Sequence, residues 1–300
     1  MSLQPNLQLR PLHPLFAAEA SGIDLTKAVD AATVRAVDDA MNQYAVVVFR
    51  GQPLTEDQQV AFAGSFGTLD SGLKKLYPGA PSRFKHEETI DISNVRIDGA
   101  LYGASERKTI SNLANQLWHS DSSFERPAGK YSMLHSVVAP AKGGETEFAD
   151  LRAAYDALAE DLKAEIQSLH SVHAALHSRV WLGDKPPEAE FAKMPPVRWP
   201  LVRTHAGSKR RVLWVGAHAT HIVEKTVAEG RMLLLELLEH ATQREFVYRH
   251  EWRVGDLVIW DNRAVIHRGR RFDITQPREL RRTTIRDPDS MLDSAYLQAA

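Results

Sequence analysis

The strongest constraint on the fold of this 300-residue chain comes from two short segments that lie far apart in the sequence. In the first, Trp118-His-Ser-Asp-Ser-Ser-Phe124, His119 and Asp121 are two residues apart. Alternate residues of a β-strand point to the same side, so this imidazole and this carboxylate can reach one point. His267, which follows an apolar run, is the best candidate for a third ligand. Two imidazoles and one carboxylate form the facial triad of non-haem Fe(II) oxygenases. The fold must therefore bring both segments together.

Other interpretations of these histidines stay open at this level. A His-x-Asp pair is common, and each of the three side chains could have a purely structural role. A rival metal site is the set His170, His173 and His177, whose spacing would place them on one face of a helix, as a zinc site requires. We favour this set less, because it lies at the end of a predicted helix, where a cation meets the helix dipole, and contains no carboxylate.

Basic residues are dense around and after His267. Arg268, Arg270 and Arg271 follow it directly, and Arg278, Arg281 and Arg282 come soon after. Because arginine binds carboxylates with two parallel hydrogen bonds, this density favours an anionic substrate beside the metal. The alternative is a solvated basic strand that acidic neighbours balance. The sequence has no glycine-rich phosphate loop after a strand and no Gly-x-Ser-x-Gly motif.

Composition excludes several classes of protein. The net charge of −1 gives no basic field for nucleic acid. The absence of cysteine excludes disulfides, thiolate metal sites and a cysteine nucleophile. No apolar run approaches the length of a membrane span, and residues 1–16 do not resemble a signal peptide. We therefore expect a soluble cytoplasmic protein that binds neither nucleic acid nor membrane, with residues 1–300 forming one domain.

The pattern of short strands and helices predicts a mainly β protein with α-helices. Strands are expected near both ends of the chain, among them a hairpin within residues 246–260 that leads to His267. Helices are expected at residues 30–44, 55–66, 150–169 and 227–241. Residues 186–200 are rich in proline and are expected to be loops. This order favours an antiparallel barrel or jelly roll with helices packed outside it.

Residues 71–109 differ from their surroundings because they mix Gly, Pro, Ser, Lys and Arg with one short strand-like piece. Long irregular segments within a compact domain are usually functional or disordered. Since this segment directly precedes the His119 motif, we expect an active-site lid, with Lys74, Lys75 or Arg83 touching substrate. The alternative is a mobile surface loop without contact to substrate.

Taken together, these motifs resemble a known family. The residues 118–124, the sequence Gly-Gly-Glu-Thr-Glu-Phe at 143–148, Trp260-Asp-Asn-Arg263 with His267-Arg268, and Arg278-Glu-Leu-Arg-Arg282 resemble the taurine dioxygenase family. Further segments resemble its members that act on aryloxyacetates; these are residues 12–16, 49–54, 91–95, 150–158 and 236–248. The resemblance covers nearly the whole chain. It implies a double-stranded β-helix, or jelly roll, and a dioxygenase that depends on Fe(II) and uses 2-oxoglutarate as co-substrate.

The resemblance also implies roles for individual residues. His119, Asp121 and His267 would bind the iron, and Thr146 and Arg278 would hold the distal carboxylate of 2-oxoglutarate. On the substrate side, Arg282 would bind the acidic group, Asn115 would line the pocket, and His205 and His218 lie in segments that flank it.

The implied reaction couples oxidative decarboxylation of 2-oxoglutarate to hydroxylation of the carbon beside the ether oxygen of an aryloxyacetate such as 2,4-dichlorophenoxyacetate. The products would be a phenol, glyoxylate, succinate and CO2. The partners would be a small anionic aromatic substrate, 2-oxoglutarate and O2, and the family implies a homo-oligomer. A sulfonate or alkyl sulfate dioxygenase of the same family, a zinc hydrolase and a non-enzymatic ligand-binding jelly roll remain alternatives.

Overall fold

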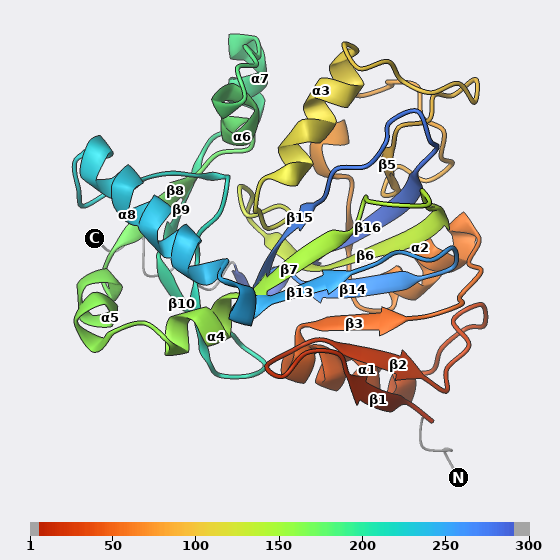
Figure 1. The fold of residues 1–300 in the computed structure, drawn as a ribbon, viewed down its shortest axis with the longest axis horizontal. Helices are drawn as coiled ribbons and strands as arrows, with labels where there is room; N and C mark the ends of the chain where they lie inside the picture. Colours follow the sequence, from red (N-terminus) through yellow and green to blue (C-terminus); the bar gives the residue numbers. More distant parts are fainter. Residues whose placement is uncertain (1–5, 291–300) are drawn as a thin grey trace.

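The computed structural model describes residues 6–290, except for the side chains at positions 107 and 110. Its centre is a large sheet (Figure 1). In spatial order the strands are β1 (Gln8–Pro11), β2 (Ala18–Ser21), β3 (Val46–Phe49), β14 (Leu257–Asp261), β6 (Ala128–Val138), β16 (Glu279–Asp287) and β4 (Leu69–Asp70), and β5 (Ile90–Ser93) also pairs with β16. Its pairs are antiparallel except β2 with β3. Every residue of β3 and β14 is buried, as their unbroken apolar runs predict.

A second, smaller sheet completes the jelly roll. It consists of β13 (Val247–His250), β7 (Thr146–Asp150) and β15 (Val265–Gly269), all antiparallel. Phe148 and Val265 from this sheet share one buried cluster with Val48, Leu134 and Trp260 from the large sheet. The two sheets therefore pack face to face over an apolar layer, and the predicted mainly β jelly-roll fold with external helices is confirmed.

Two helices cover the outer face of the large sheet. They are α1 (Ala31–Tyr44) and α2 (Glu56–Gly64), and Val37, Met41 and Phe62 pack against residues of β3, β6 and β14. Asp30 caps α1, and Thr55 with Gln58 forms a capping box at α2. Both helices lie close to the ranges that the sequence predicted, 30–44 and 55–66.

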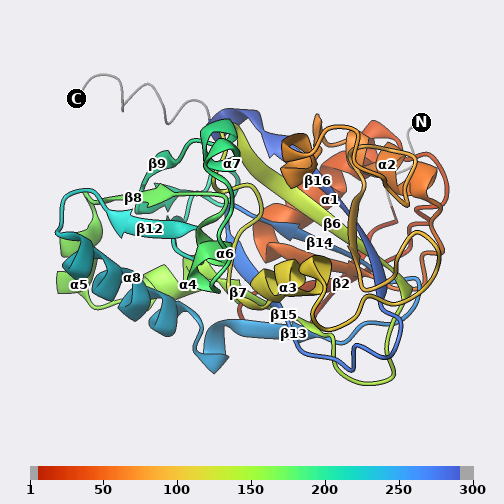
Figure 2. The same ribbon diagram turned by 90° about the horizontal axis from the view of Figure 1, so that it is seen from above.

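A lobe of helices and short strands lies beside the jelly roll (Figure 2). Its helices are α4 (Leu151–Asp156), α5 (Glu160–Ile166), α6 (His177–Trp181), α7 (Glu188–Lys193) and α8 (Val227–Ala241), with the short turn η3 (Arg244–Phe246). Its strands are β8 (His170–His173), β9 (Val197–Pro200), β10 (Val202–Thr204), β11 (Arg211–Leu213) and β12 (Ala219–Ile222). The helix α8 has the predicted bounds, and its Leu233 and Leu237 share a buried cluster with Ile266 of β15.

Three predictions about this part of the chain are wrong. The helix expected at residues 150–169 is two short helices, α4 and α5. His170 and His173 lie on strand β8, which pairs with β9 and β12, and only His177 is helical, so the rival cluster does not share a helix face. The expected loop at 186–200 contains α7 and β9.

The expected hairpin between β13 and β14 is also absent from the described residues. β13 pairs with β7, whereas β14 pairs with β3 and β6. The chain passes from one sheet to the other through a turn at Gly255, where φ is +84°. A jelly roll favours this crossover because neighbouring segments in sequence cover opposite faces of one core.

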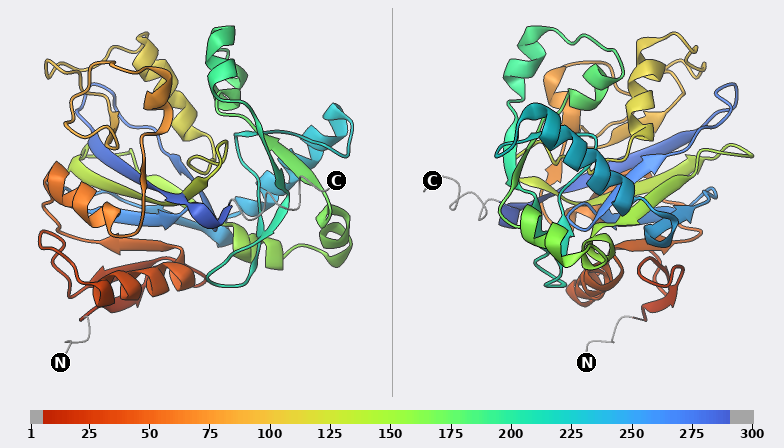
Figure 3. Two further views of the ribbon diagram at one scale, coloured as in Figure 1. Left: turned by 180° about the vertical axis from the view of Figure 1, so that it is seen from behind. Right: turned by 60° about the vertical axis from the view of Figure 1, so that its left-hand side comes forward.

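The segment of residues 71–109 is partly ordered into elements. It contains η1 (Gly72–Leu76), β5 and the first residues of α3 (Arg107–Leu113), which leads through η2 (Ala114–Gln116) to the His119 motif. Figure 3 shows this segment and α3 rising above one end of the sheets, with α6 and α7 rising beside them.

Candidate active site

His119, Asp121 and His267 meet at one point inside the jelly roll. His119 faces His267, which lies within β15, across an isolated antiparallel bridge. Their ligand atoms and those of Asp121 lie within 4.8 Å of one another, and all three residues are buried. The Nε2 atom of His119 is 4.0 Å from Oδ1 of Asp121, and Nε2 of His267 is 3.8 Å from Oδ2. This spacing leaves room for one ion between the three groups.

The protonation states suit a divalent cation. Nδ1 of His119 lies 2.7 Å from the carbonyl oxygen of Leu117, so it carries the proton and Nε2 keeps its lone pair. Burial lowers the pKa of His119 and holds the pKa of His267 well below its usual value. Burial opposes ionisation of Asp121, but the Arg282 guanidinium beside it outweighs burial and holds the pKa at about 2. Two neutral imidazoles and one carboxylate are the forms that bind a metal.

Two further residues fix the carboxylate of Asp121. The hydroxyl of Ser132 on β6 donates to its Oδ2 at 2.7 Å. The side-chain oxygen of Asn262 accepts from the backbone N–H of Asp121 at 3.1 Å, and its amide nitrogen donates to Ser132 at 3.0 Å. Sequence reasoning gave neither residue a role, although Asn262 belongs to the Trp260–Arg263 motif. Such supporting contacts orient a metal ligand and tune its basicity.

A cavity extends from the triad to Arg278 and Thr146. Its wall includes His119, His267 and both of these residues. Arg278 donates from Nη2 to the carbonyl oxygen of Gly144 at 3.1 Å, while its buried Nε has no partner. Burial lowers the pKa of Arg278 to about 10, and it has no ion pair among residues 6–290. A buried cation without a counter-ion is costly, so this end of the cavity suits an anionic ligand.

Gly143 and Gly144 do more than form a turn. At Gly144, where φ is +71°, a Cβ atom would lie 2.9 Å from Nε of Arg278. A larger residue would therefore displace the guanidinium. Thr146, two residues after Gly144, is the first residue of β7, and its hydroxyl accepts a hydrogen bond from Trp252 at 3.0 Å. The glycine pair thus allows Arg278 and Thr146 to lie on one wall.

The predicted substrate residues Arg282, Asn115 and His218 also lie at the triad. Arg282 donates from Nη1 to Oδ1 of Asp121. Arg282 and Asn115 each line both cavities at the triad. His218 lines the second cavity, and its ring contacts the rings of His119 and Phe124 at centroid distances of 6.0 and 4.7 Å. The structure therefore brings these three residues together with the ligands.

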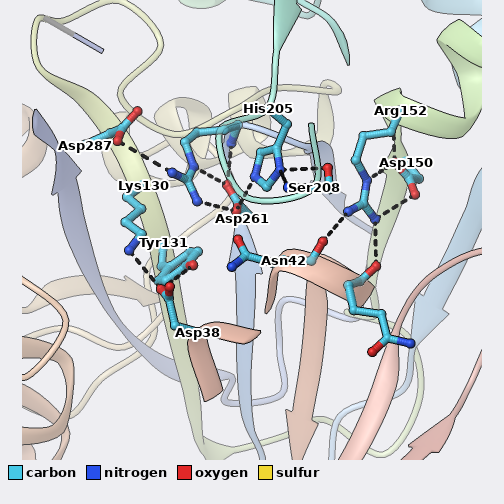
Figure 4. Close-up of polar contacts among 12 residues, drawn as sticks. Asp38, Asn42, Lys130, Tyr131, Asp150, Arg152, His205, Ser208, Asp261 and Asp287 are labelled. Atoms are coloured by element: carbon cyan, nitrogen blue, oxygen red, sulfur yellow. Dashed lines mark hydrogen bonds and ion pairs between the residues drawn. The ribbon is translucent and has the colours of Figure 1, made fainter. Parts of the chain in front are cut away.

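His205 does not join them. Figure 4 shows it in a buried polar cluster with Asp261 and Ser208. Its Nε2 is 3.0 Å from Oδ2 of Asp261, and its Nδ1 is 2.9 Å from the hydroxyl of Ser208. Arg263 forms an ion pair with the same carboxylate at 2.7 Å. The side chain of His205 is fully buried and lines neither cavity at the triad, so it holds the turn between β10 and β11.

Most of the predicted basic side chains have partners away from the triad. Lys75 pairs with Asp70 and Glu125, and Arg83 pairs with Glu279 at 2.6 Å. Lys74 donates to the carbonyl oxygen of Thr89 at 2.6 Å. None of these three lines the cavities at the triad. After His267, Arg268 pairs with Glu147 and Arg281 donates to the carbonyl oxygen of Leu54.

A jelly roll that presents a buried facial triad beside an anion-binding pocket defines a metal-dependent oxygenase. Residues 8–284 match the sequence model of the family described as taurine catabolism dioxygenase TauD, TfdA family, and the chain belongs to this family. It is accordingly an oxidoreductase that uses Fe(II) and takes 2-oxoglutarate as co-substrate.

Individual relatives agree over nearly the full length. The chain is 59% identical over 278 residues to the alpha-ketoglutarate-dependent 2,4-dichlorophenoxyacetate dioxygenase of Cupriavidus pinatubonensis, covering 92% of this chain and 96% of that one. It is 33% identical to the alpha-ketoglutarate-dependent sulfate ester dioxygenase of Pseudomonas putida, over 93% and 89% of the two chains. The crystal structure of AAD-2 in complex with Mn(II) and N-oxalylglycine superposes with a TM-score of 0.86 at 43% identity, covering 94% and 97%.

Within residues 6–290, no helix is both long enough and apolar enough to cross a bilayer.

Proposed function

We propose that this enzyme hydroxylates the carbon beside the ether oxygen of an aryloxyacetate, with 2,4-dichlorophenoxyacetate as a substrate. The observation that carries this proposal is the 59% identity, over 92% of the chain, to a dioxygenase named for that compound. The site supports it, because Arg282 places a guanidinium directly beside the ligand Asp121. A carboxylate bound there would hold its neighbouring carbon next to the metal.

The residues divide the work of binding. Arg278 and Thr146 would hold the distal carboxylate of 2-oxoglutarate, since Arg278 is a buried cation without an ion pair among residues 6–290. Arg282 would bind the substrate carboxylate, and Asn115, Phe124 and His218 would surround the rest of the molecule. Fixing the reacting carbon in this way is a contribution of positioning.

Iron(II), with 2-oxoglutarate and O2, would supply the oxidant, and 2-oxoglutarate would leave as succinate and CO2. Hydroxylation replaces one C–H bond of the methylene group by C–OH and produces a hemiacetal. The hemiacetal then loses its hydroxyl proton, the bond from that carbon to the aryl oxygen breaks, and the aryl oxygen takes a proton. The products are a phenol and glyoxylate.

The direct test is anaerobic loading with Fe(II) and 2-oxoglutarate, followed by air, with and without 2,4-dichlorophenoxyacetate. We expect succinate and free phenol in equal amounts. Succinate without phenol would reject this substrate while keeping the oxygenase. Protein that holds iron but forms neither product would contradict the reaction as a whole.

A second candidate substrate class is the alkyl sulfates and sulfonates. The sulfate ester dioxygenase of Pseudomonas putida supports it, as does Arg282, which can pair with any of these anions. Hexyl sulfate in the same assay separates the two classes. Family membership leaves the zinc hydrolase and the non-enzymatic binding protein without support.

We further propose that residues 6–290 act as one domain in which residues 71–109 form a lid. Gly72 and Leu73 line the second cavity, while Asn94 and Thr109 line the first, so this segment borders both. Slower proteolysis within it when 2-oxoglutarate and substrate are bound would support the lid, and an unchanged rate would contradict it. A cytoplasmic location, which the sequence led us to expect, stays a prediction that fractionation can test. A homo-oligomer, which the family implies, stays a prediction that light scattering can test.

A further inference from the structure

The second cavity at the triad contains an arginine to which neither the family motifs nor the proposed reaction gives a role. This residue is Arg179, on α6. The cavity lies between η1, α6 and the triad, and its wall includes Leu73, Asn115, Phe124, Arg179, His218 and Arg282. Two guanidinium groups therefore reach one small space beside His119 and Asp121. The sequence concealed this pairing, since α6 and β16 are far apart along the chain.

Arg179 lacks the partner that a partly buried arginine usually has. Its Nε donates to the hydroxyl of Ser111 on α3 at 3.3 Å. Among the described residues it makes no ion pair, and its terminal nitrogens donate to no other side chain. Burial is the largest cause of the lowered pKa of Arg179; Tyr77, Asp184 and Glu190 oppose it, and the charge of Arg282 lowers the pKa further. Arg179 thus lies close enough to Arg282 for their like charges to repel each other.

The wall of this cavity carries more positive than negative charge. Asp121 is the single carboxylate among its lining residues. That carboxylate already receives the hydrogen bond of Arg282 and is a ligand of the metal. His218 contributes no charge, because burial holds its pKa well below the usual value. The cavity therefore has one guanidinium in excess, which an anionic ligand would balance.

We propose that Arg179 is a second anion-binding residue of the substrate pocket, and that the substrate carboxylate lies between Arg179 and Arg282. This inference rests on the proposed function in that it takes the substrate to be an anion bound beside Arg282. With two donors, the carboxylate oxygens are held from both sides, and the carbon that reacts has less freedom to turn. Arg179 thereby selects for a small anionic head group on the substrate.

A structural role for Arg179 predicts a different result. Its hydrogen bond to Ser111 ties α6 to α3 across the mouth of the site, and this tie alone could account for the residue. Ser111→Ala removes the tie and leaves the guanidinium in place, so it is the matched control. Arg179→Gln removes the charge, and Arg179→Lys keeps the charge without the planar pair of donors.

The experiment is calorimetric titration of 2,4-dichlorophenoxyacetate into protein loaded with Fe(II) and 2-oxoglutarate in the absence of O2. We expect Arg179→Gln to raise the dissociation constant about tenfold or more, which is the loss of one charge-assisted hydrogen bond. Ser111→Ala should stay within about threefold of wild type, a change below 1 kcal/mol. Arg179→Lys should fall between them, and the affinity for 2-oxoglutarate should not change in any variant.

An unchanged dissociation constant in Arg179→Gln would overturn the proposal, and so would an equal loss in Ser111→Ala. If Arg179→Gln does not fold, Arg179→Lys provides the test. A dissociation constant for 2,4-dichlorophenoxyacetate in Arg179→Lys equal to that of wild type would also contradict the proposal. Hexyl sulfate serves as a second anionic probe, and wild-type protein that binds neither anion overturns the inference. Admitting air afterwards tests the proposed function separately, since binding without phenol release rejects the reaction and leaves the role of Arg179 standing.

Discussion

His119 and His267 exchange both of their backbone hydrogen bonds. The N–H of His119 donates to the carbonyl oxygen of His267 at 3.0 Å, and the N–H of His267 donates to that of His119 at 2.8 Å. The hydroxyl of Ser120 adds a bond to the carbonyl oxygen of Val265 at 3.1 Å. The relative position of the two imidazoles is therefore set by the backbone of the jelly roll before any metal binds. This is preorganisation of a metal site by sheet pairing.

The first prediction concerns metal binding. His119→Ala and Asp121→Ala should each abolish binding of Fe(II), because two remaining ligands do not form a facial site. In wild-type protein, metal at a hundred times its dissociation constant should add about 2.7 kcal/mol to the free energy of unfolding. Metal content after gel filtration and denaturant unfolding with and without metal measure both effects.

His170→Ala is the matched control for these variants. His170 lies on β8 and pairs with Glu224 on the surface of the lobe, at 2.8 Å. Its loss should leave both the metal content and the stabilisation by metal unchanged. Full iron occupancy in either ligand variant would refute the assigned triad.

The ligands themselves were predictable from the sequence, whereas their supports were not. The spacing of His119 and Asp121 predicted that both side chains reach one point, although His119 lies in an isolated bridge and Asp121 in a turn rather than on a strand. The family motifs single out His267. Ser132 and Asn262 act on Asp121 only through contacts that close across the fold, and no local pattern encodes those distances. The Arg282–Asp121 ion pair was not predicted from the sequence for the same reason.

The same division holds for the fold. The helices α1, α2 and α8 were predicted well because the spacing of apolar residues along a helix is a local signal. The chain around His170 and His173 was mistaken for the end of a helix, since pairing with β9 and β12 determines its conformation. His205 was assigned to the pocket from its place in the chain, but its partner Asp261 lies on another strand.

A second prediction concerns the co-substrate. Arg278→Ala should raise the KM for 2-oxoglutarate by at least about tenfold, because it removes the buried cation at the far end of the cavity. The KM for the aryloxyacetate should change little. Steady-state assays that vary each substrate separately give both values.

Arg210→Gln provides the control for this charge change, since Arg210 pairs with Asp156 at the surface, at 2.6 Å. Both of its KM values should match those of wild type. An unchanged KM for 2-oxoglutarate in Arg278→Ala would mean that the anion binds elsewhere.

A third prediction concerns Arg282, which contacts both Asp121 and the substrate pocket. Arg282→Ala should raise the KM for the aryloxyacetate about tenfold or more. Because its guanidinium also holds the pKa of Asp121 at about 2, the variant should bind iron more weakly in acid than wild type does. Kinetics at saturating iron and metal titrations at two pH values separate the effects. A normal substrate KM would contradict the assignment of Arg282.

The last prediction follows from His173, a histidine that is buried away from the metal. Its ring lies between the hydroxyls of Ser123 and Ser171, each at 3.1 Å, and burial lowers its pKa to about 3. In the unfolded chain the imidazole of His173 has its ordinary pKa near 6.5. Between pH 6.5 and 3 this imidazole is therefore protonated in more of the unfolded molecules than of the folded ones. The contribution of His173 to stability is therefore complete above pH 6.5 and is lost progressively as the pH falls toward 3.

From pH 7.5 to 5 this one histidine should lower the free energy of unfolding by about 2 kcal/mol. Urea unfolding of metal-free protein at both pH values measures the total loss, to which other buried histidines also contribute. In His173→Gln, which is uncharged at both pH values, the loss should be smaller by about the same 2 kcal/mol. If the pH dependence of His173→Gln matches wild type, then the pKa of His173 is the same in the folded and the unfolded protein, and the prediction is wrong.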